Sequence, residues 1–437
     1  MAGRLGSHAR FSCEKQPNKV EFLKKQFAPD RLFTDAAELL SGYGHCAIKE
    51  ERVQVPWVSM IAAGFPCTSR TSLSSHSGSN KHCVQNEEGA TGEGWAIVRD
   101  YIFQFKPHVF LLENVPNLAA TSDDATCMMA ASDADHIVQT FQQRGMWCTY
   151  FAMDSREYGS FCERKRLYFL GGSGVSAYSE TMSHQIALSC SIGPGNLSDF
   201  MWVENTDLKD ELAQLGLEEA QEGEAVDCDK NEPLYKEKIE NEPLYKDDHC
   251  EYFREAKLVW PPNLSEAPHI DCSGLSRRAA ELVFFMDAVH PPPPGAQRLP
   301  EFFDANTNMK RLLKSDATGK RKSPWVTHPM TVTGQSKIIF RYTKEPGNSF
   351  VRQLRSVEYF ALIGWFPSDF NAPMLLPTML LSSSLAGNAY SSYHLGPALM
   401  SLLASHGLRC TAREAEEEVS VEDVPSSQLT IPSSADY

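Results

Sequence analysis

Residues 58–67 read VSMIAAGFPC, an apolar run that ends in a Gly-Phe-Pro turn and a cysteine. The run 58–63 has the length and composition of a buried strand. Because Pro66 fixes the backbone just before Cys67, the thiol is expected on a rigid turn at a sheet edge. A cysteine nucleophile needs such a setting. The alternative, which a Pro-Cys pair alone favours, is a buried structural cysteine.

Strands and helices alternate on both sides of this stretch, through residues 11–172. The apolar patterns predict strands at 10–14, 109–112, 147–153 and 166–170, and helices at 18–27, 94–105 and 137–144. This alternation predicts an α/β fold with a parallel sheet covered by helices on both faces. Ligands of such folds bind beyond the carboxyl ends of the strands, which is where Cys67 and Glu113 are expected.

The composition is that of a globular protein with a real core. The chain has 437 residues, of which 42% are hydrophobic. It contains no apolar run of eighteen residues and no signal-peptide pattern, so no membrane partner is predicted and an intracellular protein is expected. None of its 12 cysteines forms a Cys-x-x-Cys pair. This predicts reduced thiols and no metal site.

The net charge of −15 does not exclude a nucleic-acid partner, because the acidity is local. Residues 204–255 hold 18 acidic and 6 basic side chains, and residues 413–437 hold 7 acidic and 1 basic. The remainder of the chain is therefore weakly basic. The acidic segments need not describe a binding cleft.

The chain divides into four parts by composition. Residues 1–172 are expected to form a catalytic domain and 173–324 a second region, with a disordered acidic insertion at 203–256. The chain returns to the first domain over 325–410, and an acidic, disordered tail is expected at 411–437. Helices are predicted at 276–290, 350–365 and 393–405. A basic stretch supplies residues for phosphate contacts, or is simply a solvated loop: Lys310, Arg311, Lys320 and Arg321.

A cysteine and a glutamate at adjacent strand ends suit one reaction on a pyrimidine. A thiolate attacks C6 of the ring, and a glutamate whose pKa is raised by burial shares a proton with N3. C5 then becomes nucleophilic enough to accept a methyl group. Arg164 and Arg166 alternate at a strand start and so share a face, where one can bind the base O2. An ordinary basic strand edge is the alternative.

The motifs, taken in order, resemble those of the cytosine-C5 DNA methyltransferase family. The similar stretches are Gly64–Cys67 (the Pro-Cys motif), Glu113–Val115 (Glu-Asn-Val), Tyr158–Arg166 (Gln-x-Arg-x-Arg, with Cys162 replacing the glutamine), Arg352–Phe370 (a late helix) and Gly387–Ala389 (a final Gly-Asn motif). The resemblance covers about residues 11–172 and 325–408. Each motif alone is weak, whereas five in order are specific.

The resemblance implies a fold, a cofactor and a substrate. It implies a Rossmann-like sheet that binds S-adenosyl-L-methionine, and a smaller target-recognition domain. Methyl transfer to C5 of a cytosine flipped out of double-stranded DNA would proceed through a covalent bond between cysteine and C6. A nuclear location is expected if the source is eukaryotic, and a cytoplasmic one otherwise. The implied site residues are Cys67, Glu113, Arg164 and Arg166 for catalysis, Glu14, Asp35 and Asn388 for the cofactor, and Pro66 and Asn114 for the substrate.

Two departures from the family pattern leave alternatives open. The opening strand and the Phe-x-Gly-x-Gly cofactor loop are not found. The chain is therefore expected to be truncated at its start, rather than to carry a degenerate cofactor site. Cys162 is expected to support the neighbouring loops more loosely than a glutamine would. The rival functions are methylation of transfer RNA and nucleic-acid binding without catalysis. A binding protein would have no need of Cys67, Glu113 and Arg166 together.

Overall fold

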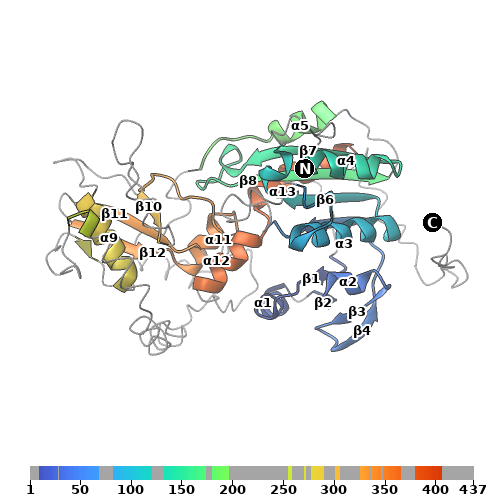
Figure 1. Cartoon of the computed structure of the whole chain (residues 1–437), viewed down its shortest axis with the longest axis horizontal. Helices are drawn as coiled ribbons and strands as arrows, with labels where there is room; N and C mark the ends of the chain where they lie inside the picture. The colour runs from blue at the N-terminus through green and yellow to red at the C-terminus, as the bar shows by residue number, and fades with distance from the viewer. Residues whose placement is uncertain are drawn as a thin grey trace, which may run out of the picture.

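A computed structural model of the chain shows a larger and a smaller lobe, with helices α11 (Ser356–Ala361) and α12 (Met379–Asn388) between them (Figure 1). The described residues are 9–27, 29–67, 82–120, 132–173, 180–195, 254–257, 270–271, 277–289, 301–305, 325–333, 336–345, 348–365 and 379–405. No helix within these ranges combines the length and the apolar character that a membrane crossing requires.

The larger lobe is built on a four-stranded sheet with the order β5-β6-β8-β7. Its strands are β5 (Met60–Gly64), β6 (Val109–Asn114), β7 (Met146–Asp154) and β8 (Lys165–Ser173). β5 and β6 run parallel, as predicted, whereas β8 runs antiparallel to both β6 and β7. The prediction of a parallel sheet is therefore confirmed for β5 and β6 and wrong for β8. The ten residues between β7 and β8 are too few for a crossover helix, so the chain turns back on itself.

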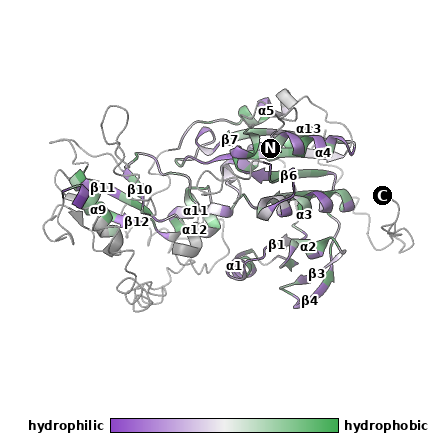
Figure 2. Ribbon diagram, viewed as in Figure 1, coloured by the Kyte–Doolittle hydropathy of each residue, from purple (hydrophilic) through white to green (hydrophobic). Residues whose placement is uncertain are grey.

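Helices cover both faces of this sheet. One face packs Phe110, Leu112 and Phe169 against α3 (Gly89–Phe105) and α4 (Asp133–Gln142). The other packs Leu111 and Tyr168 against α13 (Ser392–Ser405), which also contacts α5 (Glu180–Leu188). Hydrophobic and hydrophilic residues mix along α3 and α4 in Figure 2, as expected of helices with one buried face. The predicted α/β architecture is confirmed.

A second, N-terminal sheet has the order β1-β2-β3-β4. It consists of β1 (Ser12–Cys13), β2 (Leu32–Phe33), β3 (Tyr43–Cys46) and β4 (Glu51–Gln54), with α1 (Pro17–Phe27) and α2 (Ala36–Leu39). Among the described residues, β1 pairs only with β2 and β5 only with β6, so no ladder joins the two sheets. They are joined by side chains instead, because Ile61 and Phe11 pack in the same cluster as Phe33 and Tyr101.

The smaller lobe pairs strands that are distant in the sequence. Its sheet has the order β10-β11-β12-β9, from β9 (Ile270–Asp271), β10 (Glu301–Asp304), β11 (Ile338–Glu345) and β12 (Asn348–Gln353). Helix α9 (Arg277–Val289) packs Leu282, Phe285 and Met286 in one cluster with Phe303 and Ile339. The sheet uses residues on both sides of the boundary expected at 324, because β11 pairs with β10.

The helix predicted over 350–365 was mostly wrong. Residues 348–353 form β12, and the helix α11 is limited to Ser356–Ala361. The apolar pattern of this stretch fits either structure. Pairing of β12 with β11 along its whole length decides for the strand. Helix α12 (Met379–Asn388) then leads to α13, and two short 3-10 helices, η1 (Pro116–Ala119) and η2 (Ser155–Glu157), follow β6 and β7.

Candidate active site

The ends of β5 and β6 bring the cysteine turn to Glu113. The strands pair in a register that places Gly64 opposite Glu113. A Cβ atom on residue 64 would lie 3.2 Å from Glu113 Oε2, so the glycine leaves room for the carboxylate. The chain continues from Gly64 through Phe65 and Pro66 to Cys67, which is half-buried.

Buried contacts fasten the turn that carries Cys67. Asn114 donates from Nδ2 to the Phe65 carbonyl at 3.0 Å, and its own Oδ1 accepts from the Val115 amide at 2.8 Å. Gly94 of α3 lies so close to Pro66 that a Cβ there would be 2.5 Å from the proline ring. The predicted substrate residues Pro66 and Asn114 thus have a direct structural role, which is to hold the thiol in place.

Arg166 forms an ion pair with Glu113. The distance from Arg166 Nε to Glu113 Oε1 is 2.8 Å, and the two side chains are only 13% and 14% exposed. Arg166 also donates from Nη1 to the Lys165 carbonyl at 2.8 Å. The pair can hold the carboxylate in one orientation beside Cys67.

Arg164 points from the same strand end into the protein interior, where its side chain is 2% exposed. Its Nη atoms donate to the carbonyls of Val332 (3.4 Å), Gly387 (3.2 Å) and Ala389 (2.7 Å). Burial and the neighbouring charge of Arg166 lower the pKa of Arg164 to about 10. The side chain therefore remains a cation at neutral pH.

The charges of these residues act on the thiol of Cys67. Burial is the largest influence and raises its pKa, and the carboxylate of Glu113 raises it further. Arg166 opposes them, followed by Arg164, because a nearby cation favours the thiolate. The structure therefore brings together the four predicted catalytic residues. The thiol stays protonated at rest and becomes more acidic when the charge of Glu113 is neutralised.

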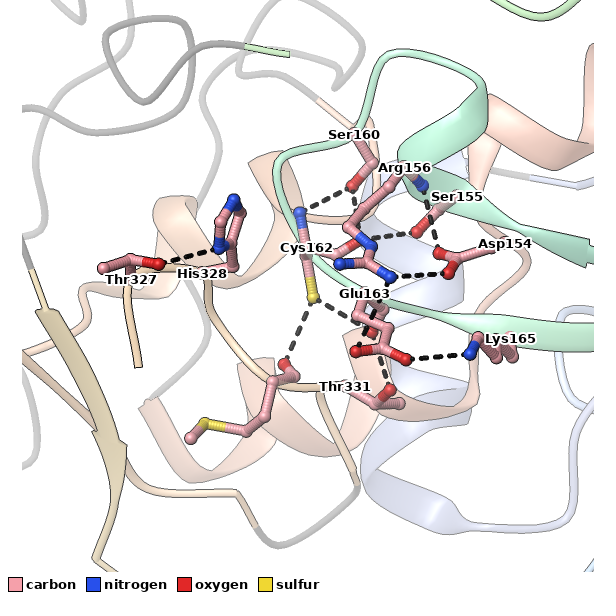
Figure 3. Close-up of polar contacts among 11 residues, drawn as sticks. Asp154, Ser155, Arg156, Ser160, Cys162, Glu163, Lys165, Thr327, His328 and Thr331 are labelled. Carbon is pink, nitrogen blue, oxygen red and sulfur yellow. Dashed lines mark hydrogen bonds and ion pairs between the residues drawn. The ribbon is translucent and has the colours of Figure 1, made fainter. Parts of the chain in front are cut away.

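Cys162, which replaces the motif glutamine, is fully buried in the loop before β8 (Figure 3). Its Sγ lies 3.2 Å from the Met330 carbonyl, and its amide donates to Ser160 Oγ at 3.0 Å. Ser155 and Ser160 both donate to the Cys162 carbonyl. The hydroxyls of Ser155 and Ser160 thus help to support this loop, whereas the sequence analysis considered only the side chain of residue 162.

An ion-pair network borders this loop on its exposed side. Figure 3 shows Arg156 between Asp154 and Glu163, and Lys165 beside Glu163. The N···O distances are 3.1 Å for Arg156–Asp154, 3.8 Å for Arg156–Glu163 and 3.2 Å for Lys165–Glu163. The side chain of Arg156 is 35% exposed. The two pairs made by Glu163 are partly exposed and contribute little to stability, whereas the side chain of Asp154 is only 11% exposed. Arg156 therefore offers a control for its buried neighbour Arg164.

The predicted cofactor residues lie at strand ends and at a helix junction. Glu14 follows β1 and accepts from the Gln16 amide at 2.8 Å, and Asp35 caps α2 by accepting from the Ala37 amide at 2.9 Å. β1 and β2 are parallel neighbours, so both carboxylates leave the same edge of their sheet. Asn388 ends α12 with an exposed side chain that bonds to no described residue.

The predicted phosphate-binding residues lie outside the described part of the chain: Lys310, Arg311, Lys320 and Arg321. The acidic insertion lies outside it up to residue 253, and the tail from residue 411 entirely.

Sequence reasoning missed a buried polar cluster behind the Arg166–Glu113 pair. Tyr168 sits directly opposite Glu113 in the β6–β8 register, and its hydroxyl lies 3.2 Å from Nδ1 of His394 in α13. Burial, followed by the charges of Arg164 and Arg166, lowers the pKa of His394 to about 3, so the imidazole is neutral. The alternation of residues 164, 166 and 168 was a signal for Tyr168, whereas nothing local indicated His394.

Comparison with known proteins gives matches of one kind. A family model described as "C-5 cytosine-specific DNA methylase" matches residues 6–390. DNA (cytosine-5-)-methyltransferase DMT5 of Cryptococcus neoformans is 28% identical over 162 residues, which are 36% of this chain and 6% of that protein. Type II methyltransferase M.NgoBV of Neisseria gonorrhoeae is 22% identical over 161 residues, 37% of this chain and 34% of its own length. The chain thus matches only a small part of either relative. The S. pombe Dnmt2 methyltransferase structure has a TM-score of 0.44 at 10% identity, and the match covers 90% of each chain.

Proposed function

Because the chain belongs to the C-5 cytosine-specific DNA methylase family, we propose that it methylates C5 of cytosine in double-stranded DNA. The family uses S-adenosylmethionine as its methyl donor. The observation that carries the proposal is the joining of Cys67, Glu113 and Arg166 at the ends of adjacent strands. A protein that only binds nucleic acid does not need a held thiol beside a paired carboxyl group.

The proposed reaction begins at C6 of a cytosine that has left the duplex stack. The thiolate of Cys67 forms a bond to C6, and the electron pair of the C5–C6 double bond moves into the ring. Glu113 shares a proton with N3, which stabilises the charge that develops there. C5 then takes the methyl group, and the electron pair of the broken sulfur–methyl bond would stay on the sulfur of the donor, which leaves as S-adenosylhomocysteine. Loss of the C5 proton to a base restores the double bond and releases Cys67 as a thiolate.

Arg166 has two roles in this scheme. It orients Glu113 through their 2.8 Å contact, and its charge favours the thiolate of Cys67. When Glu113 shares a proton with the base, its negative charge no longer raises the pKa of the thiol. Base entry and thiol ionisation are therefore favourably coupled, because both depend on the charge of one carboxylate.

The described residues fit the adenosine half of the methyl donor. Glu14 and Asp35 each use one oxygen for a local backbone amide, which leaves the other to accept from ribose hydroxyls or an adenine amine. Asn388 adds an exposed amide. When bound, S-adenosylmethionine supplies an electrophilic methyl group. The residues named here bind and orient it.

The choice of DNA over RNA rests on two observations. The family model is that of a DNA methylase, and 185 residues lie between Arg166 and Arg352, enough for a domain that reads a duplex. Transfer RNA is the rival substrate, since enzymes that act on it resemble the DNA enzymes. The two are separated directly by offering both substrates to the same protein.

The test uses a DNA duplex of mixed sequence in which 5-fluorocytosine replaces cytosine. Fluorine at C5 blocks the final elimination, so the covalent product with the full-length protein is expected to persist on a denaturing gel. Mass spectrometry should find the base on Cys67. Cys67→Ser should form no adduct, whereas the control Cys190→Ser, at another half-buried cysteine, should form it normally.

Three results would overturn the proposal. An adduct on Cys83 or Cys162 would move the active site away from Cys67. Methylation of transfer RNA in the absence of any DNA product would assign the other substrate. Binding of DNA without methyl transfer or adduct formation would show a protein that has kept the fold and lost the reaction.

A further inference from the structure

The guanidinium of Arg164 connects three segments that are far apart in the sequence. Its three acceptors are backbone carbonyls at residues 332, 387 and 389, between 168 and 225 residues further along the chain. Two of them, Gly387 and Ala389, flank Asn388. The planar guanidinium donates from both Nη atoms at fixed angles, which a lysine ammonium cannot reproduce.

These hydrogen bonds do not neutralise the positive charge of Arg164. Among the described residues, Arg164 forms no ion pair, although its side chain is 2% exposed. A buried cation without a carboxylate partner is destabilising unless its donors are well satisfied. The presence of the unpaired Arg164 here is therefore explained best by the backbone segments that its donors hold in place.

The turn between α12 and α13 is also fastened from its other side. Trp365 donates from Nε1 to the Tyr390 carbonyl at 3.0 Å, and the Ser392 amide donates to the Ile363 carbonyl at 2.9 Å. The Tyr168–His394 bond ties the start of α13 to the strand that carries Arg166. Within this fastened turn, Asn388 alone presents an exposed side chain without a described partner.

We propose that Arg164 is a positioning residue, which fixes the turn carrying Asn388 at a set place relative to Cys67 and Glu113. The cofactor side and the base side of the site are then coupled through one side chain. This inference rests on the proposed function, since it assigns Asn388 to the cofactor. Losing the clamp should leave the turn in several arrangements, of which only a fraction bind the cofactor.

The test compares Arg164→Lys with the matched control Arg156→Lys in the full-length protein. Arg164→Lys keeps the cationic charge near Cys67 and loses the geometry. Hydrogen exchange in the absence of cofactor should become faster at the amides of residues 387–392. Calorimetry should show about 10- to 30-fold weaker binding of S-adenosylhomocysteine, as expected for two lost hydrogen bonds. The KM for the methyl donor should rise with it, while kcat changes less than about threefold.

Arg156→Lys should leave exchange, affinity and KM unchanged, because the ion-pair partners of Arg156 are Asp154 and Glu163, neither of which lies in the turn. If Arg164→Lys does not fold, Tyr168→Phe serves instead. It removes the hydroxyl that reaches His394 and should speed exchange at the start of α13.

The outcomes separate this inference from the proposed function. Unchanged exchange at 387–392 in Arg164→Lys overturns the clamp whatever the activity. Faster exchange in a variant whose cofactor affinity and KM match the wild type shows a merely structural contact and also overturns it. A wild-type protein that binds no S-adenosylhomocysteine refutes the proposed function, while the exchange result still shows whether Arg164 holds the turn.

Discussion

Buried arginines are neutralised in the smaller lobe and left partly unneutralised beside Cys67. In the smaller lobe Arg341, 3% exposed, forms ion pairs with Asp287 and Glu301 and lies 3.9 Å above the ring of Trp325. Arg352 forms two bonds of 2.6 Å to Glu358, which is fully buried. In the larger lobe Arg166 forms an ion pair with Glu113, whereas Arg164 forms no ion pair among the described residues and bonds to backbone carbonyls instead.

The difference indicates what each group of charges is for. A fully paired arginine organises strands and helices and leaves no net charge for a ligand. The unpaired positive charge beside Cys67 is instead available to a thiolate, to the base and to the carboxylate as it changes protonation. Substitutions in the smaller lobe should therefore change stability, and equivalent substitutions in the larger lobe should change chemistry.

The largest effect is expected for Glu358→Gln. The substitution leaves Arg352 buried without its countercharge, which should lower the free energy of unfolding by about 3–5 kcal/mol. Guanidinium chloride unfolding measures the change. As a control, Glu21→Gln breaks the exposed Glu21–Lys25 pair of α1 and should have no measurable effect. A loss below about 1 kcal/mol for Glu358→Gln would show that the paired arginines are not stabilising.

Arg166→Gln should have the opposite effect, with a large loss of methyl-transfer rate and a smaller loss of stability. It removes the charge that orients Glu113 and favours the thiolate, so methyl transfer should fall by about 10²–10³-fold. Stability should fall less than in Glu358→Gln, because the carboxylate left behind on Glu113 is 14% exposed rather than fully buried, and because the loss of Arg166 relieves repulsion with Arg164. Single-turnover rates and unfolding curves of the same preparation test both halves. Equal losses of rate and stability would remove the distinction between the lobes.

Much of the fold was predictable, because the larger lobe is built from local patterns. The strands that end at Gly64 and Asn114 and the helices α3, α4 and α13 all have clear apolar periodicity. The smaller lobe was not predictable in this way, because its strands are defined by their pairing. β10 pairs with β11 between residues that are about 35 to 40 positions apart, and β11 pairs with β12 across a turn. No local pattern reports such pairing.

The chemistry of the site was predictable only in part, for the same reason. Cys67, Glu113 and Arg166 could be predicted because each lies at or just beyond the end of a strand of the sheet. The engagement of Arg164 with Gly387 and Ala389 depends on contacts across more than 220 residues, and so does the bond between Tyr168 and His394. Motif spacing identifies which residues take part, whereas the structure shows what each one touches.

The smallest effect is expected in the pH dependence of Cys67 alkylation. Burial and Glu113 raise the pKa of this thiol while Arg166 lowers it, so the reactive thiolate should accumulate only above the ordinary range for cysteine. Glu113→Gln removes a raising influence and should shift the midpoint of iodoacetamide reaction to lower pH. Arg166→Gln removes a lowering influence and should shift it to higher pH. Because both variants also break the same ion pair, a structural disturbance alone would move both midpoints in one direction. Opposite shifts are therefore the signature of charges acting directly on the sulfur, and parallel shifts would refute that reading of the larger lobe.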